Sequence, residues 1–421
     1  MDRTQALLRD LPAPEDPDPQ RSLVAVVDRD TGEVTVLSGD EDAARAEVLV
    51  RGRGRTLAHV PLDGARGFAE RAVAETPPGL PSRGWRLDGG RDLPATIVLC
   101  TLGKNPLLPL AVRAVLGQSH PHLELIVVDN NPSSGDVPRL LAGYRDPRLR
   151  IIPEPRPGLS RARNRGLQEA TGEVVAFTDD DALPDPRWLG SLLDVFAAAP
   201  AGEIGAVTGP AFAAELLSRP QRFFESRGGF PRGLTPVVWS LTPPGARIAE
   251  LGEPGEGGPL FPFATARVGA GVSMAFSRAG VAALGHFDES LGAGTRTRGG
   301  EDLDAFARVL RAGLPIVYTP DAVVHHVHRR DMAGLQAQIH GNGTGMAALL
   351  LTAVLRHPGE LPRLLRRIPA VLARVAPGTE RMQGRDEDVP AALSRAEIRG
   401  FLQGPFLYLR ERLRRPAGDG R

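Results

Sequence analysis

Cysteine, net charge and long apolar runs are all scarce in this sequence. The single cysteine among 421 residues, Cys100, excludes an intrachain disulfide framework and is compatible with a reducing cytoplasm. The 51 basic and 50 acidic side chains leave a formal charge of +1, so we expect no nucleic-acid partner. No run approaches the ~20 apolar residues of a membrane-spanning helix, and the N-terminus lacks an apolar signal core. We therefore expect a cytoplasmic protein.

The length predicts several units rather than one average domain. Proline and aspartate are frequent in residues 1–20, which is typical of a flexible leader. Apolar runs at 23–27 and 33–37 flank a turn and predict two strands. Prolines and glycines at 77–90 mark the end of this part. The predicted regions are a flexible leader (1–20), a small β-containing accessory region (21–92), a catalytic unit (93–330) and a C-terminal helical region broken by prolines (331–421).

Strand and helix patterns alternate in the catalytic unit. This alternation predicts an α/β fold with a mostly parallel sheet covered by helices. Because ligands gather at the carboxyl ends of parallel strands, acidic residues at two such ends should share one crevice. These residues are Asp129 and the triplet at 179–181. The predicted strands are 95–101, 123–129, 148–152 and 173–178, and the helices between them are 107–116 and 159–170.

Three consecutive carboxylates, Asp179, Asp180 and Asp181, follow the apolar run 174–177. Buried acids repel one another unless a cation compensates them, and oxygen ligands suit Mg²⁺ or Mn²⁺ better than zinc. The alternative is a solvated acidic turn that caps the next helix. A second acidic pair about 120 residues later favours the metal site.

The order and spacing of several motifs resemble family-2 glycosyltransferases of the GT-A fold. The resemblance covers residues 94–330 and excludes 1–90 and 331–421. It implies a nucleotide-diphospho-sugar transferase that moves a sugar to an acceptor hydroxyl with inversion, using Mn²⁺ or Mg²⁺ on the diphosphate of the donor. A UDP-sugar is the favoured donor. The motifs are residues 96–101, 118–121, 124–130, 158–166, 172–173 and 179–181, followed by 269–276, 285–289 and 299–304.

The resemblance implies which residues bind the metal. Asp179 and Asp181 match the first and last acids of the family's DxD motif. A histidine after the strand-like run 316–318 often completes the metal shell, and this sequence has three: His325, His326 and His328. Period-two alternation puts His326 and His328 on one face and His325 on the other. The sequence does not decide which one points inward; we take His326 as the third ligand, with a structural role as the alternative.

Donor binding is implied for four more residues. Asp129 resembles the acid that contacts the base or ribose, and Arg163 resembles a nucleotide-contacting arginine. Thr101, at the end of the first strand, and Asp180 are placed in the same site. The alternatives are a strand-end turn for Asp129 and a solvated helix face for Arg163, which lies among other arginines.

An attacking sugar hydroxyl must lose a proton, so a carboxylate beside the acceptor is required as a general base. The acidic pair Glu301 and Asp302, which follows the glycine-rich loop 292–300, matches the family's catalytic pair. We take Asp302 as the base. The alternative is that the pair only caps the helix that runs to residue 310.

The C-terminal region is basic, with 13 arginines against 7 acidic residues between 356 and 415. Its amphipathic stretch suits either peripheral contact with an anionic inner membrane face that presents a lipid-linked acceptor, or packing on the catalytic unit. The predicted function is glycosyl transfer in polysaccharide, cell-envelope or glycoconjugate synthesis. The alternative is a non-catalytic sugar-nucleotide-binding or assembly subunit of the same fold, which would not need Asp302. The stretch consists of Leu364, Leu365, Ile368, Val371 and Leu372 beside Arg363, Arg366, Arg367 and Arg374.

Overall fold

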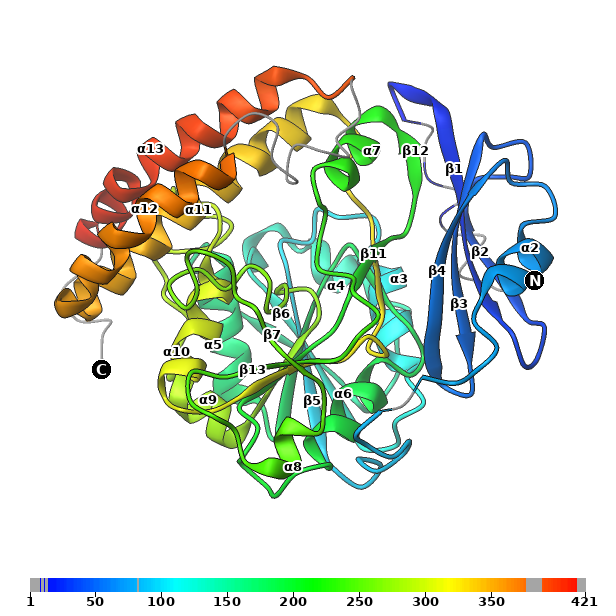
Figure 1. Cartoon of the computed structure of the whole chain (residues 1–421), viewed down its shortest axis with the longest axis horizontal. Helices are drawn as coiled ribbons and strands as arrows, with labels where there is room; N and C mark the ends of the chain where they lie inside the picture. Colours follow the sequence, from blue (N-terminus) through cyan, green and yellow to red (C-terminus); the bar gives the residue numbers. More distant parts are fainter. Residues whose placement is uncertain (1–7, 9–10, 12–13, 82, 376–387, 415–421) are drawn as a thin grey trace.

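A computed structural model describes residues 8, 11, 14–81, 83–375 and 388–414, without the side chains of 368 and 370–375. Figure 1 shows three parts: an N-terminal sheet, a central α/β unit and long C-terminal helices that lie along one side of it. No helix in the described ranges is long and apolar enough to cross a membrane.

The central sheet has nine strands. Neighbours β8, β5, β6 and β7 are parallel, whereas β15 is antiparallel to both β8 and β10. The expected α/β architecture with a mostly parallel sheet is confirmed. In spatial order the strands are β14 (Glu253–Pro254), β13 (Val237–Trp239), β16 (Ile316–Tyr318), β10 (Ala206–Thr208), β15 (Met274–Ser277), β8 (Val174–Asp179), β5 (Ala95–Thr101), β6 (Leu123–Asp129) and β7 (Leu149–Pro153).

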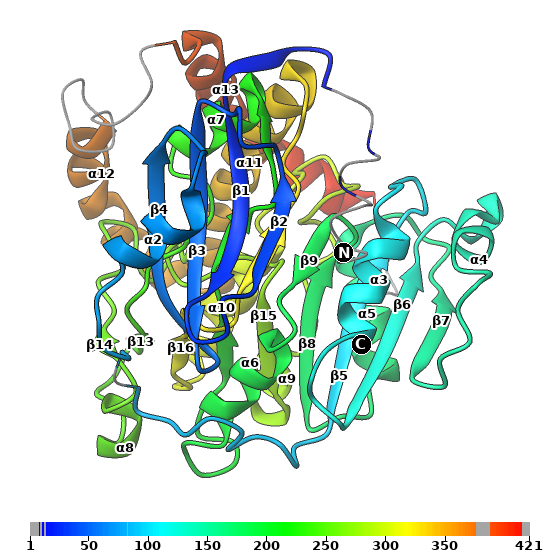
Figure 2. The ribbon, with the colours of Figure 1, turned by 90° about the vertical axis from the view of Figure 1, so that its right-hand side faces the viewer.

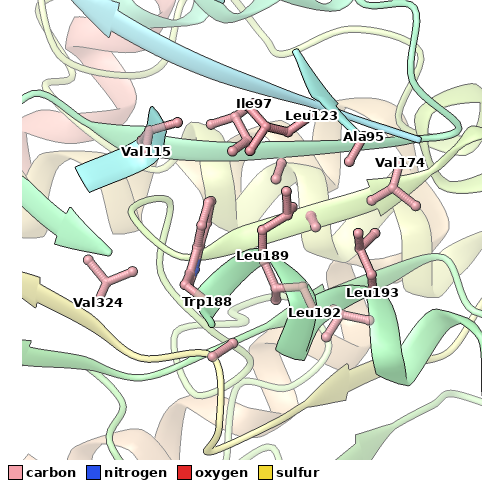
Figure 3. Packing of buried hydrophobic residues seen from close by; sticks show 14 of the residues in the cluster. Ala95, Ile97, Val115, Leu123, Val174, Trp188, Leu189, Leu192, Leu193 and Val324 are labelled. Carbon is pink, nitrogen blue, oxygen red and sulfur yellow. The ribbon is translucent and has the colours of Figure 1, made fainter. Parts of the chain in front are cut away.

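Helices cover both faces of this sheet (Figure 2). On one face, Trp188, Leu189 and Leu192 pack beneath Ile97 and Val174 (Figure 3). The indole Nε1 of Trp188 donates to Ser273 Oγ at 3.0 Å, so this buried polar atom is satisfied. The helices are α3 (Leu108–Leu116), α4 (Asp136–Leu140), α5 (Leu159–Glu169), α6 (Trp188–Phe196), α8 (Ala246–Ala249), α9 (Arg278–Leu284) and α10 (Glu301–Arg311), with a 3₁₀ turn η1 (Pro132–Ser134).

A small third sheet positions the end of the acidic triplet. Its central strand β17 (Val324–His326) lies between β11 (Ala211–Ala213) and β9 (Ala182–Pro184). The antiparallel register of β17 and β9 pairs His326 with Ala182, and Val327 N donates to Asp181 O at 2.9 Å. This pairing brings the triplet to the histidines.

The N-terminal sheet contains the two predicted strands, β1 (Pro17–Asp28) and β2 (Val34–Ser38), which are confirmed. Two further strands, β3 (Arg45–Gly52) and β4 (Arg55–Asp63), and the helix α2 (Phe68–Glu75) were not predicted.

The expected flexible leader is wrong for residues 17–20, which begin β1 and pair with β12 (Leu216–Ser218) of the catalytic unit. Asp18 is buried there because its carboxylate accepts a 2.5 Å hydrogen bond from Arg222. Pro17 occupies the first residue of the strand, where proline is tolerated. The accessory region and the catalytic unit therefore share one sheet.

The expected C-terminal helical region is confirmed over its described residues. Helices α11 and α13 lie side by side, because glycines let their backbones approach closely (Figure 1). A Cβ on Gly400 would lie 2.2 Å from His340 O. The elements of this part are α7 (Arg219–Ser226), α11 (Met332–Arg356), η2 (Pro358–Glu360), α12 (Leu361–Val375) and α13 (Ala391–Leu413).

Candidate functional site

Asp179, Asp181 and His326 form a candidate metal centre. One ligand atom of each lies within 4.8 Å of the other two. Asp179 ends β8, Asp181 precedes β9, and His326 ends β17, so three strand ends build the centre. Two carboxylates and an imidazole are a donor set that fits Mn²⁺, and the oxygen ligands also suit Mg²⁺.

Charge compensation within the centre is incomplete. Burial would raise the pKa of Asp181, but the imidazole of His326, 3.1 Å away, outweighs it and holds that pKa below its usual value. Burial would lower the pKa of His326, but Asp181 raises it above its usual value. Asp179 keeps a raised pKa, because burial outweighs the attraction of Arg163. A cation would therefore compete with the proton on His326 and stabilise both carboxylates.

The histidine run alternates as predicted. His326 Nδ1 lies 3.1 Å from His328 Nδ1, and His328 Nε2 lies 2.7 Å from Glu225 Oε1 on α7. These contacts orient the ring of His326. His325 points the other way, toward Phe212, and burial lowers its pKa to about 4. Glu225 was not predicted, because nothing in the sequence near α7 marks it as a partner of a strand 100 residues later.

Arg163 on α5 joins the metal centre to the acidic pair. Its guanidinium donates to Glu301 Oε1 at 3.0 Å and to Asp179 Oδ1 at 3.4 Å. The Nη2 atom of Arg163, which donates to Asp179, also donates to Gly271 O at 3.4 Å. Arg163 is only 2% exposed, so the structure brings it to the site but engages it with protein carboxylates.

Glu301 and Asp302 begin α10 after Gly300, whose φ of 92° favours glycine. Glu301 is buried; burial and the neighbouring Asp302 raise its pKa to about 7. Asp302 is half-buried, and its Oδ2 accepts from Gly271 N at 2.8 Å. Besides burial and Asp181, Asp302 contributes to the raised pKa of Asp179, so the charges of Asp302 and Asp179 interact.

The remaining predicted donor residues lie at neighbouring strand ends. Thr101 Oγ1 donates to Asp180 Oδ2 at 2.5 Å, and Asn105 donates to Asp180 Oδ1 at 3.1 Å. Asp180 thus contacts the end of β5 rather than the candidate metal centre. Burial raises the pKa of Asp180 to about 6. Asp129 pairs in register with Thr101, and its carboxylate accepts from Asn131 N at 3.0 Å.

Comparison with known proteins adds an independent finding. Residues 96–242 match the sequence model of glycosyl transferase family 2. Polypeptide N-acetylgalactosaminyltransferase 11 of Xenopus tropicalis is 30% identical over 57% of this chain and 39% of its own length. The pre-mycofactocin glycosyltransferase of Mycobacterium tuberculosis is 28% identical over 49% and 37%. A mannosyltransferase from Pyrobaculum calidifontis, solved with GDP-Man and Mn²⁺, aligns over 79% of this chain and 88% of its own with 19% identity and a TM-score of 0.44.

The chain spans less than half the length of these two curated relatives. The matched range contains Asp129, Arg163 and the acidic triplet, whereas Glu301 and Asp302 lie beyond it. Over residues 96–242 the chain is therefore similar to glycosyl transferase family 2.

Proposed function

We propose that this protein transfers a sugar from a nucleotide diphosphate donor to an acceptor hydroxyl, with Mn²⁺ or Mg²⁺ held by Asp179, Asp181 and His326. The observation that carries the proposal is that Arg163 pairs with both Asp179 of this metal centre and Glu301, while Gly271 links Arg163 to Asp302. Both curated relatives are named as glycosyltransferases, which supports the reaction class.

When bound, the cation would stabilise the negative charge of the leaving diphosphate. The chain's own residues supply the rest. Asp302 takes the proton of the acceptor hydroxyl as that oxygen attacks the anomeric carbon opposite the leaving group, which inverts this centre. Thr101, Asp129 and Asp180 lie at adjoining strand ends where a uridine nucleotide would bind.

Asp302 suits the base better than Glu301 does. Glu301 is buried and engaged by Arg163, so its carboxylate is not free to meet an acceptor. Asp302 is half-buried, and its Oδ2 and Oδ1 each accept one backbone hydrogen bond, from Gly271 N and Leu303 N, both at 2.8 Å. Each oxygen can accept a second hydrogen bond, so an acceptor hydroxyl can still meet this carboxylate. We infer that Glu301 positions Arg163, and that Asp302 contacts the substrate.

Release of nucleoside diphosphate from a panel of sugar nucleotides, with Mn²⁺ or with chelator, tests the proposal. Asp302→Asn should lower turnover by about 10²–10⁴-fold while donor affinity stays near wild type. Asp181→Ala should weaken metal-dependent donor binding. Glu203→Gln, an exposed carboxylate elsewhere, is the matched control. Wild-type turnover in Asp302→Asn would reject the base, and donor binding without release under any condition would favour a non-catalytic subunit.

We also propose that the C-terminal helices bind an anionic membrane surface from the cytoplasmic side. Leu402 is 75% exposed and Leu413 is 85% exposed, and three more apolar side chains continue their stripe at helical spacing. Exposed arginines flank the stripe, so charge complementarity favours anionic lipid over a second copy of the chain.

Of the amphipathic stretch predicted on α12, Leu365 is exposed, whereas the side chains of Ile368, Val371, Leu372 and Arg374 lie outside the described ones. On α13, the stripe of Leu402 and Leu413 also contains Ile398, Phe406 and Leu409, and the arginines beside it are Arg395, Arg399, Arg410, Arg412 and Arg414.

Flotation with vesicles tests this surface. The wild-type chain should float with phosphatidylglycerol vesicles and less with phosphatidylcholine vesicles. A Leu402→Asp and Phe406→Asp double variant should stay in the soluble fraction, whereas Leu80→Asp, an exposed leucine outside the helices, should float like wild type. Equal recovery of wild type and double variant would reject the membrane surface.

A further inference from the structure

Two adjoining, partly open chambers lie where the N-terminal sheet meets the catalytic unit. Their volumes are about 80 Å³ and 290 Å³, and they share the side chains of Glu47, Leu216, Glu225 and Arg232. Strands β1, β3 and β4 form one wall, and β11, β12 and β17 with α7 form the other. The larger chamber is close to the ~300 Å³ at which small-molecule pockets begin. Apart from His325, none of the residues that line the chambers belongs to a motif of the sequence analysis.

The walls offer both hydrogen-bond donors and acceptors. Glu47 and Glu225 contribute carboxylates, and Arg45, Arg222 and Arg232 contribute guanidinium groups. Arg232 pairs with Glu225, and His59 Nε2 lies 2.9 Å from Glu47 Oε2. Such mixed signs disfavour a bare anion or cation, because each would be repelled by part of the wall. They suit a neutral ligand with many hydroxyl groups, which donate to carboxylates and accept from guanidinium groups.

His325 is a second, independent indication that the chambers bind a ligand. Its ring lines the smaller chamber and is 5% exposed, yet among the described residues neither ring nitrogen has a partner at good hydrogen-bond geometry. The backbone of Ala213 interacts with the ring and acts to raise its pKa, but it does not meet that geometry. A buried polar group without a partner is costly, so such groups in native proteins call for a bound partner. The ring of Phe212 lies beside His325 and supplies the apolar surface on which a sugar ring packs.

The chambers connect to the candidate metal centre through three hydrogen bonds. Glu225 contacts His328, His328 contacts His326, and His326 contacts Asp181. We propose that the chambers are a saccharide subsite that holds a sugar residue of the acceptor away from its reacting hydroxyl. The inference rests on the proposed function in taking the acceptor to be a glycan, and it gives the N-terminal sheet a role in substrate binding.

Saturation-transfer NMR on the full chain, without metal or donor, tests the subsite. The probes are the methyl glycosides of glucose, galactose, mannose, N-acetylglucosamine and N-acetylgalactosamine. At least one should receive saturation, and Glu47→Gln and Arg232→Gln should each weaken its affinity by about tenfold, because each removes a charged hydrogen-bond partner. Glu41→Gln, an exposed carboxylate of the same sheet region, should bind like wild type.

Labelling of wild-type carboxylates with a carbodiimide and an amine gives a measurement that needs no variant. The bound glycoside should protect Glu47 and leave Glu41 reactive. Saturation of no glycoside, equal affinity in all variants, or unprotected Glu47 would each overturn the subsite. Because this binding needs no turnover, a chain that binds the glycoside but releases no nucleoside diphosphate would reject the proposed function and not the site.

Discussion

Gly271 joins the two sides of the site. Its N–H donates to Asp302, and its carbonyl accepts from Arg163. A Cβ at this position would lie 2.7 Å from Arg163 Nη2. The guanidinium has little room to move, because Asp179 and Glu301 both hold it.

We expect Gly271→Ala to displace Arg163 and lower turnover by about tenfold to a hundredfold, since small misplacements at a reacting site are costly. Steady-state release of nucleoside diphosphate measures this. Gly233→Ala, where an added Cβ meets nothing within 4 Å, is the control and should keep wild-type turnover. Unchanged turnover in Gly271→Ala would show that the position of Arg163 does not matter to the reaction.

His325 should make stability depend on pH. Its pKa is about 4 in the folded chain against 6.5 when exposed, so the unfolded state binds more protons between these values. The free energy of unfolding should therefore fall as pH drops from 6.5 to 4, by on the order of 3 kcal/mol from this group. Urea unfolding at pH 7 and pH 4.5 should show a smaller fall in His325→Gln than in wild type or in the exposed control His286→Gln. Equal falls in all three proteins would contradict the assignment.

At the scale of elements, the approach of α11 and α13 depends on glycine. We expect Gly400→Ala to destabilise the fold by about 1–3 kcal/mol, because its Cβ would clash with His340 O and push the helices apart. Gly190→Ala, in α6 with no atom within 4 Å of the added Cβ, should stabilise by up to about 1 kcal/mol through helix propensity. Thermal unfolding compares the two. A gain in stability for both variants would mean that the helices separate without cost.

The bounds of single strands were the part of the fold that the sequence predicted best. The strands that deliver Asp129 and Asp179 have apolar runs with clear ends, and the predicted bounds agree with β6 and β8 to within one residue. The sequence also held a signal for the hairpin of β3 and β4 that we did not use, because Arg53 and Gly54 lie between two apolar runs. In the structure both residues have a positive φ, as such a turn requires. The pairing of β17 with β9 had no such signal, because register between distant strands is set by tertiary packing.

The same division holds within the candidate site. The family resemblance pointed to the triplet, Arg163 and the acidic pair. The structure brings Asp179, Asp181, His326, Arg163 and Glu301 into one network. Spacing could not show that Arg163 already has two protein partners. It could not show Glu225 or the chambers either, since both arise only where the N-terminal sheet meets α7.

For the whole molecule, Asp321 holds the N-terminal sheet to the catalytic unit. Its carboxylate is 1% exposed and accepts from Arg55 at 3.0 Å, Thr56 N at 2.9 Å and Arg83 at 3.1 Å. Removing one partner of a buried ion pair leaves an uncompensated charge.

We expect Asp321→Ala to destabilise the protein by about 3–5 kcal/mol and to separate the unfolding of the two parts. Scanning calorimetry should then show two transitions in place of one. Asp42→Ala, which breaks the exposed pair with Arg66, should leave the transition unchanged. A single transition at the wild-type temperature in Asp321→Ala would show that other contacts hold the parts together.

The shared sheet also bears on how the chain is made. Residues 17–22 of β1 are synthesised before their partner β12, which is not complete until residue 218 has left the ribosome. Until then the leading half of β1 is an open edge, the kind of backbone that pairs with other chains. Nascent chains arrested before β12 should therefore aggregate or recruit chaperones, whereas chains arrested beyond it should not.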